Sequence, residues 1–178
     1  MKYVFYILAA LVALALLSFF TANLRVYPLI NVNGSSVWAG KYYDRLSGLE
    51  YYRRATLEPI DEETAKRGII ISLIMNELIE SELETRGIDR KEAKKRVEAA
   101  WQKAADSLEN ASRSLYGWSV DEFKEFALLP QARQDILSEV LREEGGDFNE
   151  WLNGALVKAD VKIYSLPYEW TDGVLVKK

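Results

Sequence analysis

Hydrophobic residues are distributed unevenly along the chain, and the first segment differs from everything that follows it. Residues 3–24 carry no charge, whereas charged residues recur throughout the chain from Arg25 onward. About twenty apolar residues at 1.5 Å each reach roughly 30 Å, the thickness of the hydrocarbon core of a bilayer. The pattern therefore predicts a transmembrane anchor at residues 1–24, followed by an aqueous domain at residues 25–178.

A cleaved secretory signal is the alternative interpretation of this segment. Its basic end consists of Lys2 and the α-amino group, and its apolar run exceeds the 7–15 residues usual in such signals. Phe20-Thr21-Ala22 places a bulky residue at the first small position of a cleavage site. These features favour a retained anchor. With Lys2 before the segment and Arg25 after it, the positive-inside rule favours a cytoplasmic N-terminus and a domain in the periplasm or at the cell surface.

Helical periodicity dominates the rest of the chain. The expected helices occupy residues 41–57, 62–86, 90–116, 130–144 and 148–158, with a short helix opening at Ser119. The apolar stripe of 62–86 is so wide that we expect this helix at the centre of the core. Apolar residues recur every three or four positions in 90–116 and include Trp101, which we expect to be buried. Because a short turn at Gly87 separates these two helices, we expect a long antiparallel hairpin.

Two segments have the character of strands. Asn33-Gly34 lies between short apolar stretches, which is the strongest local signal of a β hairpin. Residues 160–170 resemble a strand that Pro167 confines to a sheet edge or ends. The predicted fold class is therefore mainly α: a transmembrane helix, then a multi-helix domain with the long hairpin and a small β element formed by the segments near 26–38 and 160–170.

Composition narrows the possible functions. The chain has 23 Lys and Arg, 27 Asp and Glu, no His, no Cys and a formal net charge of −4. An acidic chain is a poor partner for nucleic acid. Without His and Cys it has no imidazole base, no thiolate nucleophile and no His-bearing metal site. The carboxylates at Glu77, Glu80, Glu82 and Glu84 lack the spacing of a di-iron site and indicate a solvated acidic face. We expect no metal, no cofactor and no enzyme activity.

One stretch of the chain resembles a known family. Leu115-Tyr116-Gly117-Trp118-Ser119 precedes Glu122-Phe123-Lys124 and Leu128-Leu129-Pro130, and Asp147-Phe148 and Trp151-Leu152 come later. With Asn31-Val32-Asn33-Gly34, these residues resemble the N-terminal chaperone domain of the SurA, PrsA and PpiD type of extracytoplasmic folding factor. The resemblance covers residues 30–160. Full-length members also carry a parvulin-type prolyl isomerase domain that uses histidines, so we expect no isomerase activity in this chain.

The resemblance implies a chaperone that holds unfolded or partly folded exported polypeptides by low-specificity apolar contact, without ATP. The candidate client-binding residues are aromatic: Tyr42, Tyr43, Tyr51, Tyr52, Trp118, Phe123 and Phe126. Trp151 and Trp170 flank the terminal strand. As alternatives, one tyrosine of each pair lies in the core, or the pairs form a belt at the bilayer surface. Trp118, Phe123 and Phe126 could instead pack the joint between two helices.

Two other functions compete with the client holder. One is a scaffold protein whose helical domain binds a single defined envelope partner. The other is an enzyme built on a carboxylate pair or on a serine–lysine pair, for which the sequence offers no characteristic spacing.

Overall fold

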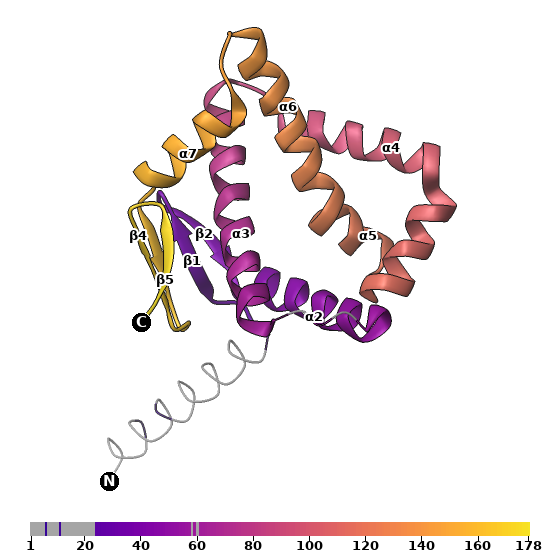
Figure 1. Ribbon diagram of the computed structural model, residues 1–178, viewed down its shortest axis with the longest axis horizontal. Coiled ribbons are helices and arrows are strands. Elements are labelled where there is room, and N and C mark those ends of the chain that lie inside the picture. Colours follow the sequence, from indigo (N-terminus) through magenta and orange to yellow (C-terminus); the bar gives the residue numbers. More distant parts are fainter. Residues whose placement is uncertain (1–5, 7–10, 12–23, 58, 60) are drawn as a thin grey trace.

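The domain is organised around one long central helix. The computed structural model describes residues 6, 11, 24–57, 59 and 61–178. In Figure 1, α3 (Glu62–Thr85) runs through the middle of this part of the chain, with strands on one side and α6 and α4 on the other. Its buried residues face several directions: Ile69, Ile70, Leu73, Ile74, Leu78, Ile79 and Leu83. The prediction of a central helix is confirmed.

The other helices begin and end close to the residues that their caps predict. They are α2 (Ala39–Thr56), α4 (Arg90–Ala111), α5 (Val120–Phe123), α6 (Leu129–Glu143) and α7 (Phe148–Lys158), joined in part by the π-helical turns η1 (Ser112–Tyr116) and η2 (Lys124–Leu128). Ser119 and Glu122 form a capping box at the start of α5. Asp147 caps α7 by accepting the backbone N–H groups of Asn149 and Glu150. The chain is mainly helical, as its periodicity indicates.

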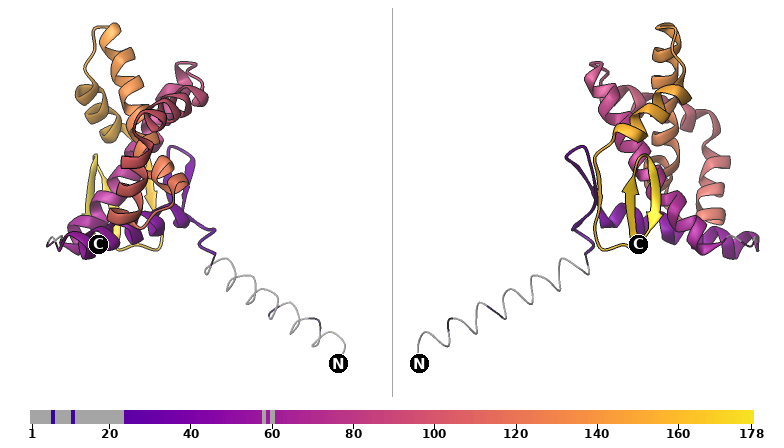
Figure 2. Two further views of the ribbon diagram at one scale, coloured as in Figure 1. Left: turned by 90° about the vertical axis from the view of Figure 1, so that its right-hand side faces the viewer. Right: turned by 60° about the vertical axis from the view of Figure 1, so that its left-hand side comes forward.

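Two small antiparallel sheets complete the fold. The first has the order β2-β1-β3, and the second is the hairpin β4-β5: β1 (Pro28–Val32), β2 (Ser35–Trp38), β3 (Val161–Ile163), β4 (Tyr168–Thr171) and β5 (Val174–Lys177). Ile30 pairs with Ile163, so the predicted β element joining the two distant segments is confirmed. The expected strand at 160–170 is divided, because the chain bends at Pro167 before it enters β4. Figure 2 shows both sheets against the first half of α3.

The core has two parts arranged along α3. The first half of α3 packs with α2 and both sheets. The fully buried residues of this first cluster include Leu29 and Ile30 on β1 and Ile70 on α3. The second half of α3 packs with the start of α4 and with α6, where Leu137 is fully buried. Trp151 on α7 packs partly buried against both clusters. This tryptophan therefore links the two halves of the domain.

The predicted long hairpin is wrong in its packing. After the turn at Gly87, α4 diverges from α3, and α6 packs against both of them (Figure 1). The Arg96 guanidinium forms two hydrogen bonds, of 2.9 and 2.7 Å, to the Glu139 carboxylate on α6. The helix also bends at Ala104, whose φ of −142° and ψ of 27° are not helical. Periodicity identifies the apolar face of α4 but not the element that covers it.

The expectation that Trp101 is a core residue is also wrong. The buried residues of α4 are Ala93 and Val97, both near its start. Trp101 is half-buried, and the Lys124 ammonium lies 4.9 Å from its ring centroid. Beyond Val97 the helix has left the core, so Trp101 has a cation above its ring in place of a close-packed apolar shell.

Replacing Trp101 by alanine is expected to lower the free energy of unfolding by about 1–2 kcal/mol. Full burial would make the loss about 3–5 kcal/mol, and a cation–π contact at a partly exposed site contributes about 0.5–1 kcal/mol. Urea unfolding of residues 25–178, followed by far-UV circular dichroism, measures the difference. A loss above 3 kcal/mol would contradict the half-buried position of this side chain.

Among the described residues, no helix has both the length and the apolarity needed to cross a membrane. The predicted spanning segment, residues 3–24, lies outside the described residues except at Tyr6, Leu11 and Leu24.

Candidate functional site

The first tyrosine pair of the predicted client surface is divided between core and edge. Tyr42 is 2% exposed and belongs to the core between α2 and the sheets, so its prediction as a client-binding residue is wrong. Tyr43 is half-buried and meets the Tyr42 ring edge-on at 5.1 Å between centroids. The Arg25 guanidinium lies 4.7 Å from the centroid of the Tyr43 ring. Because neighbouring helix positions point about 100° apart, one tyrosine of this pair is buried and the other faces the edge.

Most of the other predicted residues meet at one place, here called the aromatic joint: Tyr52, Tyr116, Trp118, Phe123 and Phe126. The Tyr116 ring stacks between two others, with centroid distances of 5.5 Å to Tyr52 and 4.8 Å to Trp118. Phe126 meets the Trp118 ring edge-on at 5.4 Å. These rings come from α2, η1, the loop at 117–119, α5 and η2, so the aromatic joint connects the far end of α4 to α2.

Two glycines permit this close packing. Gly48 is buried on α2, and a Cβ atom there would lie well inside van der Waals contact with the Trp118 ring. Gly117 has a φ of +63°, and a Cβ atom there would lie 2.7 Å from Cδ2 of Tyr51. The Trp118 indole N–H donates a 3.2 Å hydrogen bond to the Asp44 carbonyl, which fixes the ring over Gly48.

The aromatic joint is therefore primarily a packing element. Phe123 is 7% exposed, so its prediction as a client-binding residue is wrong, and Trp118, Phe126 and Tyr52 are half-buried. Tyr51, at 41% exposed, is the most accessible of the predicted residues that the structure describes. The structure favours joint packing, the alternative considered for Trp118, Phe123 and Phe126.

Sequence reasoning missed one buried polar residue at the aromatic joint. The Ser112 side chain is fully buried, and its hydroxyl donates a 2.7 Å hydrogen bond to the Trp118 carbonyl. The same hydroxyl lies 3.2 Å from the Ser119 carbonyl. A serine within an amphipathic helix pattern resembles a solvated position, so the pattern carries no signal of this role.

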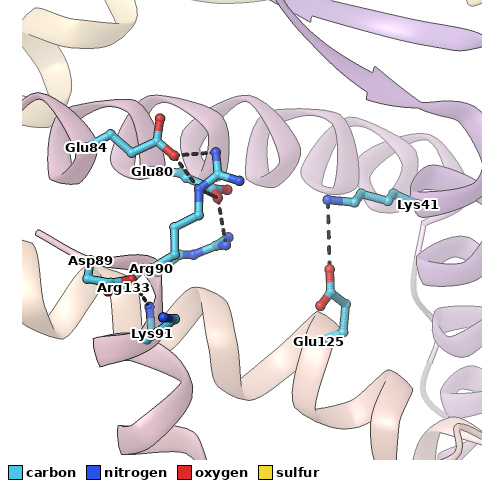
Figure 3. A network of polar contacts seen from close by, with 8 residues as sticks. All are labelled: Lys41, Glu80, Glu84, Asp89, Arg90, Lys91, Glu125 and Arg133. Atoms are coloured by element: carbon cyan, nitrogen blue, oxygen red, sulfur yellow. Dashed lines mark hydrogen bonds and ion pairs between the residues drawn. The ribbon is translucent and has the colours of Figure 1, made fainter.

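The predicted solvated acidic face is found only in part on α3: Glu84 is exposed, whereas Glu77, Glu80 and Glu82 are half-buried. Figure 3 shows the Glu80 carboxylate between two guanidinium groups, 3.1 Å from Arg90 and 3.0 Å from Arg133. The side chains of Glu80 and Arg133 are 14% and 15% exposed. Arg90 also pairs with Glu84. These contacts join α3 to α4 and α6, so the carboxylates hold the diverging helices together.

The neighbouring Glu77 is also removed from solvent. Burial raises the pKa of its carboxyl above the ordinary value, and Lys41 and Arg133 oppose this rise. Lys41 itself lies 3.8 Å from Glu125 on η2 (Figure 3). Among the described residues, no group of three or more acidic side chains is placed to hold a metal ion. The structure thus places Glu80 and Glu84 in ion pairs between helices and Glu77 in a half-buried position beside them.

A separate cleft lies between α3 and α7. It encloses about 530 Å³ and is lined by Asn33, Leu78, Ser81, Glu82, Leu141, Gly146, Asp147, Glu150, Trp151, Gly154, Ala155 and Lys158. Leu78, Leu141 and Trp151 supply apolar walls, and they belong to the buried clusters or pack against them. None of the predicted client-binding residues lines this cleft. The Gly145-Gly146 turn and the Asp147 cap position α7 beside α3, which creates the cleft.

The dimensions of the cleft suit an extended chain. Its lining runs along α7 from Asp147 to Lys158, and eleven helical residues at 1.5 Å each give about 16 Å. An extended polypeptide covers that length with about five residues at 3.3 Å each. At Gly154, an added Cβ would meet no described heavy atom within 4 Å, so the cleft is open at its middle.

Comparison of the chain with protein-family models, with curated proteins and with solved structures gave no match.

Proposed function

We propose that this chain is a membrane-anchored, extracytoplasmic chaperone that holds unfolded or partly folded exported polypeptides without enzymatic turnover. The observation that carries the proposal is the 530 Å³ cleft between α3 and α7, with apolar walls at Leu78, Leu141 and Trp151. Its volume lies within the range of about 300–1,000 Å³ typical of binding pockets. Apolar walls with a polar rim suit low-specificity contact with an extended segment.

The proposal places the anchor in residues 3–24, with the N-terminus in the cytoplasm and residues 25–178 outside it. Its support is the uncharged run of about twenty residues, which matches a bilayer in length. The proposal also includes membership of the SurA, PrsA and PpiD type of N-terminal chaperone domain. The support for membership is the Tyr116-Gly117-Trp118-Ser119 motif, which contributes two rings to the aromatic joint and the N-cap of α5.

The proposed client contact lies in the cleft and not at the aromatic residues that the sequence suggests. The aromatic joint keeps α2, η1 and α5 together, and its rings contact each other. The cleft, in contrast, has open space above Gly154 and an exposed rim. A binding surface needs accessible area, so the cleft is the better site for a client and the aromatic joint is its structural support.

Aggregation suppression tests the proposed function. Residues 25–178 are mixed with two unrelated denatured proteins, and light scattering follows the aggregation of each. A client holder is expected to suppress both at comparable, near-stoichiometric ratios. If neither protein is suppressed, the holder is wrong, and a scaffold that binds one defined envelope partner becomes the better proposal. Far-UV circular dichroism of the same sample controls for the helical fold of the fragment.

A further inference from the structure

The rim of the cleft carries more negative than positive charge. Glu82 on α3 and Asp147 and Glu150 on α7 contribute carboxylates, and among the described lining residues Lys158 is the one basic side chain. Asp147 and Glu150 lie at the start of α7, whereas Lys158 is its last residue. The acidic groups therefore gather at one end of the cleft, and the cation lies at the other.

The ion pairs at the rim do not neutralise this excess of negative charge. The Arg86 Nε group donates a 2.7 Å hydrogen bond to Glu82, and the same guanidinium also pairs with Glu144. One cation is thus shared between two carboxylates. The Asp147 carboxylate accepts hydrogen bonds from two backbone N–H groups. These donors carry no formal charge, so the carboxylate keeps its negative charge. Glu150 is exposed at the rim. A cationic ligand would therefore find incompletely compensated negative charge along this wall.

The apolar lining residues Leu78, Leu141 and Trp151 form the floor of the cleft, and this floor suits both the apolar part and the charged head of a cationic ligand. Trp151 lines the cleft with its ring 5.9 Å from that of Phe148, and an aromatic face attracts an ammonium or guanidinium group. Lysine and arginine also have long apolar stems that cover hydrophobic surface while the charged head stays in water. In an extended segment, successive side chains point to opposite sides, so apolar residues can face the floor while basic residues reach the rim.

From this combination we infer that the cleft selects cationic client segments, in which Lys or Arg residues alternate with apolar ones, over acidic segments of equal hydrophobicity. The inference rests on the proposed function, since it names the class of client that the cleft holds. Its ligand is a polypeptide segment, and its selectivity comes from charge on the rim together with the apolar floor.

Three labelled nine-residue peptides test the selectivity. Each has Leu or Phe at the odd positions and Lys, Glu or Ser at the even positions. Binding to the full chain in phosphatidylcholine nanodiscs is measured by fluorescence anisotropy, and empty nanodiscs provide the lipid control. At about 50 mM salt, the Lys peptide is expected to bind about tenfold more tightly than the Glu peptide. At about 500 mM salt the ratio is expected to fall below threefold, because screening shortens the reach of the charges.

Two neutralising substitutions on α7 are expected to act in opposite directions. Glu150→Gln removes a carboxylate and should weaken Lys-peptide binding roughly threefold, whereas Lys158→Gln removes the cation and should strengthen it roughly threefold. Glu169→Gln, on the exposed face of β4 and outside the cleft lining, is the matched control and should change nothing. A general loss of stability would weaken binding in both α7 variants, so it cannot explain opposite changes in their affinity for the Lys peptide.

The outcomes separate this inference from the proposed function. If all three peptides bind equally and Gly154→Leu weakens them all, the holder stands and charge selection is wrong. If no peptide binds above the empty nanodiscs, both the cleft as a client site and its selectivity are wrong. Tighter binding of the Glu peptide, or an equal effect of Glu150→Gln and Glu169→Gln, would also overturn the inference.

Discussion

Replacing Gly48 by alanine is expected to lower the free energy of unfolding by about 2–3 kcal/mol. The added methyl group would overlap the Trp118 ring, which the hydrogen bond to Asp44 and the stacked Tyr116 ring hold in place. Overpacking of this kind typically costs about 1–3 kcal/mol. A glycine-to-alanine change in a helix would otherwise stabilise it by about 0.5–1 kcal/mol, so the sign of the effect is itself diagnostic.

Gly68→Ala is the matched control for this prediction. Gly68 is an exposed residue of α3, and a Cβ atom there would meet no described heavy atom within 4 Å. This change should therefore stabilise the domain by about 0.5–1 kcal/mol. Urea unfolding of residues 25–178 measures both variants, and adding Trp118→Leu should recover part of the Gly48→Ala loss. Equal stabilisation by the two alanine substitutions would contradict the contact between Gly48 and Trp118.

Replacing Gly154 by leucine is expected to reduce client binding by at least about tenfold while the domain stays folded. The new side chain would project into open space at the middle of the cleft. There it would occupy the volume that a client side chain needs, and the lost contacts would include those to the apolar walls. Stability should be unchanged or slightly higher, because leucine is a better helix former than glycine by about 0.8 kcal/mol.

Gly68→Leu provides the control for an added apolar side chain on a helix surface. It introduces the same residue at an exposed helical glycine that does not line the cleft. Aggregation suppression and thermal unfolding of residues 25–178 are measured for both variants. We expect Gly68→Leu to suppress aggregation as well as the unchanged protein. If both variants hold clients normally, the cleft is not the client site.

Local signals in the sequence predicted the elements well because their causes are local. Asp147 and the preceding glycines set the start of α7, and the predicted range 148–158 is the range in the structure. Asn33-Gly34 has positive φ values of 50° and 92°, which the β1–β2 turn requires. Asp172-Gly173 forms a similar turn, with φ values of 50° and 84°, so this dipeptide is a local signal of the β4-β5 hairpin, which the strand prediction at 160–170 does not include.

The packing of these elements could not be predicted from the same signals. The apolar spacing around Trp101 continues past Val97, although α4 has by then diverged from α3 and bends at Ala104. Each tyrosine pair has two equivalent candidates for burial, and the choice of Tyr42 over Tyr43 depends on where the sheets lie. The cleft combines side chains from β1–β2, α3, α6 and α7, so no continuous motif encodes it.

Site-specific cross-linking tests the central claim, that the cleft between α3 and α7 contacts the client, most directly. A photoreactive benzoylphenylalanine replaces Ser81, an exposed residue of the cleft lining whose side chain leaves the middle of the cleft open, or Gly68 as the control, in the full chain in phosphatidylcholine nanodiscs. Irradiation with a labelled unfolded polypeptide is then followed by denaturing electrophoresis. We expect a strong adduct from position 81 and little from position 68. Equal yields at both positions, or an adduct from position 68 alone, would contradict a client site in this cleft.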